Sequence, residues 1–106
     1  MRKLGEIPIM REIHILDGDE DGGGHRWDST VPGKTKFPRD WDDDKILASI
    51  ADVAARPDRT PVARPHGGWI CEGTREGVEI RVATNCDGTV WTAHPLRGPG
   101  VETNPW

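Results

Sequence analysis

The sequence predicts a mixed domain in which one amphipathic helix is followed by antiparallel strands. Apolar residues recur at helical spacing over residues 43–55, and they recur at every second position between residues 69 and 94. The pairs Glu76-Gly77 and Asp87-Gly88 interrupt the second pattern and are typical of hairpin turns. Residues 17–40 are rich in glycine, proline and aspartate, which favours a long loop ahead of the helix.

The segment before this loop, residues 7–16, is ambiguous. Its β-branched residues and the early Pro8 are compatible with an extended segment and equally with a short helix. The loop that follows is long for a small domain, and loops of that length usually carry function.

The clearest element is the helix predicted at residues 43–55. Asp42 is a suitable N-cap, and the helix is expected to end before Pro57. Its apolar residues lie on one side, and Lys45 and Ser49 fall together on roughly the opposite side.

Three strands are predicted after a proline-rich linker at residues 57–65. They cover residues 69–74, 77–84 and 89–94. Thr92 and His94 are two residues apart, so they share one face of the last strand. The tail from Leu96 to Trp106 is rich in glycine and proline and is expected to be irregular.

Length and charge limit the functional classes. A chain of 106 residues with 34% hydrophobic residues suits one domain, residues 1–106, with a modest core. A net charge of -4 argues against a broad basic surface for nucleic acid, although a local site is compatible with it. No apolar run is long enough for a membrane span or a signal peptide. Cys71 and Cys86 are compatible with a disulfide and with two free thiols.

The candidate chemistry centres on His14 and His25, which bracket the glycine-rich loop. Histidine titrates near neutrality, so two histidines facing one substrate can divide the roles of general base and general acid. A lysine nearby can stabilise negative charge that develops in the transition state. Such a trio suits cleavage of RNA without a metal ion.

Several motifs resemble the bacterial EndoU nuclease family over about residues 13–95. They are the run from His14 to Asp19, Gly23-Gly24-His25, Pro32-Gly33-Lys34-Thr35, Phe37-Pro38, Trp41, Asp44-Lys45-Ile46, Glu72-Gly73-Thr74, Gly77-Val78 and Thr92-Ala93-His94-Pro95. The resemblance implies an α+β fold of the barnase, EndoU, colicin and RelE type. In that fold a helix packs on a twisted antiparallel sheet and a long glycine-rich loop carries catalytic residues.

The resemblance also implies which residues form the site. His14, His25 and Lys45 are the expected catalytic residues, and Ser49, Thr92, His94 and Lys34 are expected to bind substrate. By similarity His25 is the base and His14 the acid, an assignment that the sequence leaves open. Lys45 is preferred over the other lysines because its spacing to Ser49 resembles that of viral uridylate-specific relatives.

One position departs from the family pattern. His94 stands where the family has the tyrosine of a Thr-x-Tyr pair, and this chain has no tyrosine. Uridine preference and pH dependence are therefore open, and His94 is a candidate for a third proton-transfer group. Trp27, Trp41, Trp69 and Trp91 are expected to anchor the core or loops rather than to stack on bases.

The predicted function is that of a toxin endoribonuclease, the C-terminal part of a larger secreted protein used in contact-dependent bacterial competition. It would cut RNA, with transfer RNA and uridine as candidate targets, in the cytoplasm of a target cell. The expected partners are RNA and an immunity protein; no cofactor, metal or membrane is expected, and the chain is expected to be monomeric. The rivals are a catalytically silent EndoU-like binding module and a metal-dependent nuclease using the carboxylates of residues 17–21.

Overall fold

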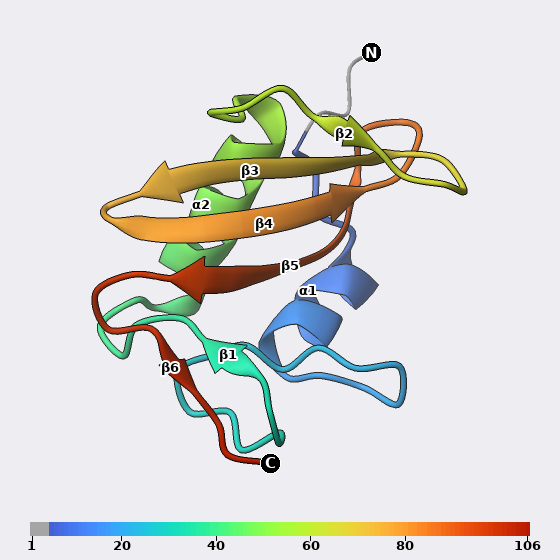
Figure 1. The fold of residues 1–106 in the computed structure, drawn as a ribbon. Helices are drawn as coiled ribbons and strands as arrows, with labels where there is room; N and C mark the ends of the chain where they lie inside the picture. Colours follow the sequence, from blue (N-terminus) through green and yellow to red (C-terminus); the bar gives the residue numbers. More distant parts are fainter. Residues whose placement is uncertain (1–4) are drawn as a thin grey trace.

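A computed structural model describes residues 5–106 as an α+β fold, which confirms the predicted fold class. Figure 1 shows two helices packed with antiparallel strands. The elements in the described residues are α1 (Ile9–Leu16), β1 (Thr35–Lys36), α2 (Asp43–Ala55), β2 (Val62–Ala63), β3 (Trp69–Arg75), β4 (Val78–Thr84), β5 (Val90–Arg97) and β6 (Glu102–Thr103). No helix within residues 5–106 is long and apolar enough to cross a membrane.

The main sheet is antiparallel and has the strand order β2-β3-β4-β5. Its central hairpin turns at Glu76 and Gly77, which both have positive φ angles of 48° and 81°. Such angles match the right-handed twist of the flanking strands, so the predicted turn is confirmed. The strand β5 is at the edge of the sheet, with β4 as its neighbour on one side only.

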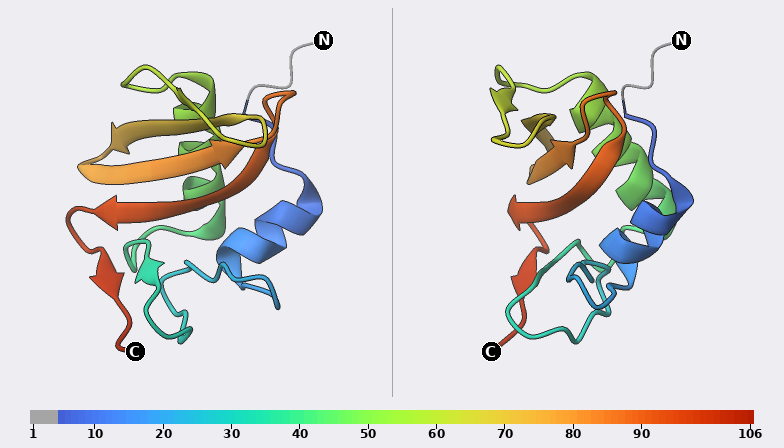
Figure 2. Two further views of the ribbon diagram at one scale, coloured as in Figure 1. Left: turned by 45° about the vertical axis from the view of Figure 1, so that its right-hand side comes forward. Right: turned by 90° about the vertical axis from the view of Figure 1, so that its right-hand side faces the viewer.

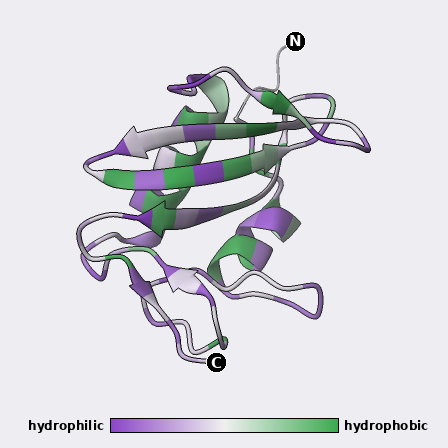
Figure 3. Cartoon of the chain, viewed as in Figure 1, coloured by the Kyte–Doolittle hydropathy of each residue, from purple (hydrophilic) through white to green (hydrophobic). Residues whose placement is uncertain are grey.

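The helix α2 follows the sequence prediction at both ends. The Asp42 side chain accepts a hydrogen bond from the backbone N–H of Lys45 at 2.8 Å, as an N-cap does. The buried side of α2 packs on the face of the sheet that carries Val78, Ile80 and Val82. Figure 2 shows α2 against this face, and Figure 3 shows apolar and polar residues alternating along β4.

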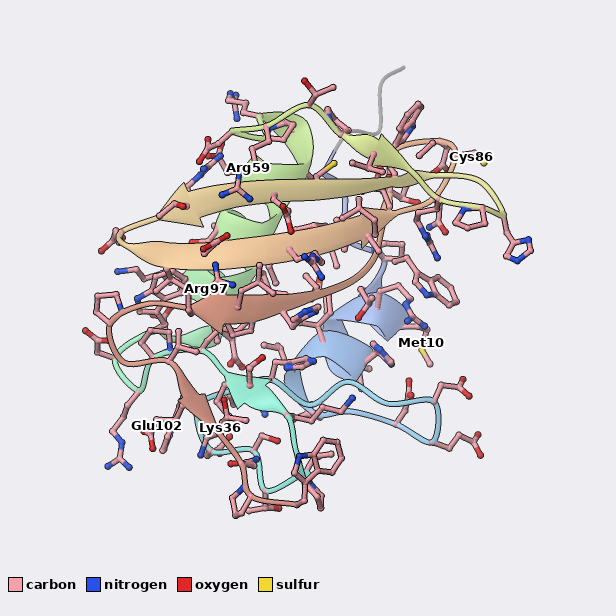
Figure 4. The ribbon with its side chains drawn as sticks, in the orientation of Figure 1. Met10, Lys36, Arg59, Cys86, Arg97 and Glu102 are labelled. Atoms are coloured by element: carbon pink, nitrogen blue, oxygen red, sulfur yellow. The ribbon has the colours of Figure 1, made fainter. Side chains whose placement is uncertain are left out.

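The opposite face of the main sheet carries polar side chains. Arg59 and Arg97, labelled in Figure 4, form ion pairs with Glu79 there, and Glu72 pairs with Arg59 and Arg81. Because side chains alternate along a strand, Thr92 and His94 also belong to this face rather than to the face under α2.

The ambiguous N-terminal segment is a helix. The last residues of α1, Ile15 and Leu16, are buried in the same core as α2, whereas Met10 is exposed, as Figure 4 shows. The helix lies beside the edge strand β5. Burial of its C-terminal apolar residues therefore decides between the two conformations that the local sequence allowed.

The tail and the linker contain more regular structure than predicted. The strand β5 continues to Arg97, β6 pairs with β1, and β2 lies within the proline-rich linker. Asn104, which is buried, also donates hydrogen bonds to the carbonyls of Ser29 and Val31. Strands of two residues have no periodicity to recognise, which explains why the sequence did not reveal them. Both cysteines are free thiols.

Candidate active site

A pocket of about 490 Å³ lies beside β5, where α1 and β1 approach this strand. It collects polar side chains from four separate parts of the chain. Its lining residues are Arg11, His14, Asp21, Gly23, His25, Gly33, Lys34, Thr35, Trp91, Thr92 and His94. Both predicted catalytic histidines, and three of the four predicted substrate-binding residues, therefore share this pocket.

The glycine-rich loop reaches the pocket by binding the end of α1. The backbone N–H groups of Gly24, His25 and Arg26 donate to the carbonyls of residues 14, 15 and 16, at 3.0, 2.7 and 3.2 Å. The last carbonyls of a helix have no partner within the helix, so the loop satisfies those of Ile15 and Leu16 and gives the His14 carbonyl a second donor besides Gly18. Gly23 permits the approach, because a Cβ atom there would lie 2.0 Å from the His14 carbonyl oxygen.

His25 is held in one tautomer. Its Nδ1 lies 2.6 Å from the backbone carbonyl oxygen of Thr35, and a carbonyl oxygen only accepts, so Nδ1 carries the proton and donates it. The Nε2 lone pair is therefore free to accept a proton. Burial lowers the pKa of His25 to about 4, and the nearby positive charge of Lys34 acts in the same direction. The ring is neutral at pH 7.

His14 is oriented by a carboxylate. Its side chain is buried, and its Nδ1 donates to Asp19 Oδ1 at 3.0 Å. This hydrogen bond lowers the pKa of the Asp19 carboxyl group. A carboxylate on Nδ1 leaves Nε2 of His14 as the ring atom for substrate chemistry, and it offsets the positive charge of the imidazolium form.

His94 stacks on His25. The two ring centroids are 5.6 Å apart and the planes are inclined by 30°. Burial lowers the pKa of His94, and the positive charges of Arg81 and Lys34 lower it further. With Thr92, this histidine lines the pocket from β5, as the two-residue spacing predicted. The residue in the tyrosine position thus supplies a flat aromatic ring against the buried histidine.

Lys34 is the lysine that the structure brings to the histidines. A Cβ atom added at Gly22 would lie 3.7 Å from Lys34 Nζ, so the amine extends over the glycine-rich loop. Its charge lowers the pKa of both His25 and His94. Within the described residues neither Lys34 nor Arg11, the other cation of the pocket, forms an ion pair.

The structure does not bring Lys45 and Ser49 to this pocket. Both are on α2, which covers the opposite face of the sheet from Thr92 and His94. Lys45 Nζ instead donates to Glu76 Oε1 at 2.9 Å, and it lies over the ring of Trp41. The expectation that Lys45 faces the same substrate as the histidines is therefore corrected. Spacing along a helix does not reveal which face of a sheet the helix covers.

Two pocket residues, and the carboxylate that binds His14, were not anticipated from the sequence. Arg11 lies one helical turn before His14 and so shares its side of α1. This spacing indicates a shared face only if the segment is a helix, which the sequence did not establish. Trp91 precedes Thr92 directly. Asp19 was noted as one of several loop acids and not as the partner of His14.

Two of the four carboxylates in residues 17–21 have protein partners, whereas Asp21 lines the pocket. Asp17 pairs with Arg26, and Asp19 binds His14. Across residues 5–106, no group of three or more histidine, cysteine, aspartate or glutamate side chains is placed to hold a metal ion.

A family model described as bacterial EndoU nuclease matches residues 12–97, which include every lining residue of the pocket except Arg11. No curated protein and no solved structure matches the chain.

The lowered pKa of His25 predicts a pH-dependent stability. Between pH 6.5 and about 4 the unfolded chain binds a proton on His25 that the folded chain does not bind, so stability decreases as the pH falls through this window. We expect a loss of at most roughly 3 kcal/mol in the free energy of unfolding. Urea unfolding at several pH values, followed by tryptophan fluorescence, measures it. His25→Gln should remove most of this slope and His66→Gln, at an exposed histidine, should retain it. Equal slopes in wild type and His25→Gln would contradict the assignment.

Proposed function

The chain belongs to the bacterial EndoU nuclease family, and from this premise we propose that it is a metal-independent endoribonuclease that leaves a 2′,3′-cyclic phosphate. The main support is the pair of buried histidines in one pocket. Each donates from Nδ1 to an oxygen of the protein and so presents Nε2 for proton transfer.

His25 is the general base in this proposal. Its neutral ring has a proton on Nδ1 and a lone pair on Nε2. Nε2 accepts the proton of the RNA 2′-hydroxyl group while the 2′-oxygen attacks the adjacent phosphorus atom. The Thr35 carbonyl, which accepts from Nδ1, stabilises the imidazolium that this step produces.

His14 is the general acid. In its protonated form it carries protons on both ring nitrogens, and the Asp19 carboxylate balances the positive charge. As the bond between phosphorus and the 5′-oxygen breaks, Nε2 gives its proton to that oxygen. The products are a 2′,3′-cyclic phosphate and a 5′-hydroxyl group, and proton exchange with water restores both histidines.

Lys34 is the cation that we propose for the transition state. The attacked phosphate gains negative charge on its non-bridging oxygens, and a fixed cation in a partly buried pocket stabilises that charge. Lys34 lines the pocket and forms no ion pair within the described residues, whereas Lys45 is engaged with Glu76 on the far side of the sheet. Lys34 therefore takes the role that the sequence assigned to Lys45.

Thr92 and His94 are proposed to contact the nucleotide. They project from β5 into the pocket, and His94 provides an aromatic ring where the family has tyrosine. Ser49 is on α2 and has no part in this arrangement. Uridine is the base that the family resemblance favours for this position, and transfer RNA is one candidate substrate.

The two rival functions have less support. A metal-dependent nuclease would need several carboxylates close together, but Asp17 and Asp19 pair with Arg26 and His14, and no group of three or more potential metal ligands is found within residues 5–106. A silent binding module is suggested by the missing tyrosine alone, while the oriented histidines serve catalysis rather than binding.

Family resemblance supports a wider biological role. We propose that the chain is the C-terminal domain of a larger secreted toxin, that it acts as a monomer on RNA in the cytoplasm of a target cell, and that an immunity protein restrains it in the producing cell.

Cleavage of RNA in excess EDTA tests the reaction. Purified protein should cut labelled RNA and leave a 2′,3′-cyclic phosphate, because the proposed steps use only side chains. His25→Ala should lower kcat by at least about a hundredfold, because it removes the general base. Intact RNA with EDTA, together with cleavage when Mg²⁺ is restored, would favour the metal-dependent rival.

A comparison of two lysine variants tests the choice of cation. Lys34→Ala should lower kcat by about 10²- to 10³-fold, because it removes a charge that acts in the transition state. Lys45→Ala should change kcat little, and loss of its exposed ion pair should cost about 1 kcal/mol or less in stability. Steady-state kinetics and urea unfolding measure both effects. The reverse order of the two kcat losses would restore Lys45 as the catalytic lysine.

Induced expression in a bacterial cytoplasm tests the toxin role. Wild type should arrest growth and degrade cellular RNA, and His25→Ala at equal protein abundance should do neither. Normal growth with wild-type protein that is active in extracts would argue against a toxin.

A further inference from the structure

Trp91 is the extra residue of a β-bulge beside the candidate active site. In the register between β4 and β5, Ala83 is opposite Thr92 and Thr84 is opposite Val90, so Trp91 has no partner. A bulge of this kind redirects the side chain of the extra residue. Val90 thereby enters the core, while Trp91 stays 43% exposed and lines the pocket.

Arg11 holds the Trp91 ring in place. Its Nε donates to the Trp91 carbonyl oxygen at 2.6 Å, and its guanidinium carbon lies 3.7 Å from the centroid of the ring. The carbonyl is available because β5 is the edge strand of its sheet. An arginine stacked on one face of a tryptophan leaves the ring oriented before any ligand binds. Ordering it on binding therefore costs little entropy.

We propose that Trp91, backed by Arg11, is the stacking subsite for the base of a nucleotide next to the scissile phosphate in single-stranded RNA. This inference rests on the proposed function. An exposed tryptophan suits a nucleotide in the wall of a pocket that also holds Lys34 and Arg11, which form no ion pair within residues 5–106, because aromatic rings stack on bases and cations attract the phosphate. A base paired in a duplex is not free to stack in this way, so the substrate is a loop or an end.

The chain offers a matched control for this residue. Trp69 is 46% exposed on β3, nearly as much as Trp91, but it lines a different pocket with Cys71 and Cys86. Removal of either tryptophan changes exposed aromatic surface to a similar extent, and only Trp91 shares a pocket with His14 and His25.

Steady-state kinetics on a short single-stranded RNA is the first test. Trp91→Ala should raise KM by about tenfold or more, with kcat changed by less than about threefold, because stacking contributes to binding. Trp91→Phe should restore most of the lost affinity, and Trp69→Ala should leave KM unchanged. An unchanged KM in Trp91→Ala, or an equal change in Trp69→Ala, would overturn the inference.

The second test removes the base instead of the ring. RNAs with an abasic ribose on either side of the cleavage position are compared with the complete RNA. At one of the two positions, loss of the base should weaken binding to the wild-type protein by about tenfold or more. The Trp91→Ala variant should bind that abasic RNA and the complete RNA with similar affinity. Equal discrimination by both proteins at both positions would show that Trp91 does not contact a base.

Binding of an RNA with a 2′-deoxy nucleotide at the cleavage position separates this inference from the proposed function. That RNA lacks the attacking hydroxyl, so its affinity is measured without cleavage. Trp91-dependent affinity in a protein that cleaves no RNA would support the subsite and overturn the nuclease mechanism. RNA cleavage with no effect of Trp91→Ala on RNA affinity would support the nuclease mechanism and overturn the subsite. Absence of any RNA binding by wild type would overturn the subsite.

Discussion

Backbone hydrogen bonds from residues 24–26 to the last carbonyls of α1 join the glycine-rich loop to the helix, and both candidate catalytic histidines depend on them. The same contact satisfies the helix end and sets His25 beside His14. The absence of a side chain at Gly23 permits it, since a Cβ atom would overlap the His14 carbonyl. The same hydrogen bonds therefore stabilise this end of the fold and position the histidines. A substitution in the loop that breaks them would affect both.

The distribution of ion pairs explains how an acidic chain can hold a phosphate. Three arginines on the open face of the sheet form ion pairs with Glu72 and Glu79, which hold their side chains in position. Lys34 and Arg11, in the pocket, form no ion pair within the described residues. Two cations therefore lie beside the histidines, together with the Asp21 carboxylate, although the net charge of the chain is -4. A local site of this kind needs no broad basic surface.

The position of the pocket lysine depends on tertiary contacts that helical spacing does not reveal. Lys45 and Ser49 do share one side of α2, as their spacing required. That side belongs to a helix packed on the face of the sheet opposite to the site. Lys34 was expected to bind substrate but not to act in catalysis. The pairing of β1 with β6 anchors its segment, and the Asn104 N–H donates to the Lys34 carbonyl. Asn104 is 70 residues further along the chain, so no local pattern reveals this contact.

The sequence by itself determined the elements whose signals are local. The helix α2 with its Asp42 cap, the hairpin at Glu76 and the shared face of Thr92 and His94 follow from periodicity, capping and turn chemistry within a few residues. His14 and His25 were candidates from their position around the glycine-rich loop, and the family motifs supported them. Only the tertiary structure decided that residues 9–16 form a helix, that Lys34 and not Lys45 shares their pocket, and that a bulge directs Trp91 into its wall. These outcomes depend on burial and on contacts between distant segments, which no short window of sequence contains.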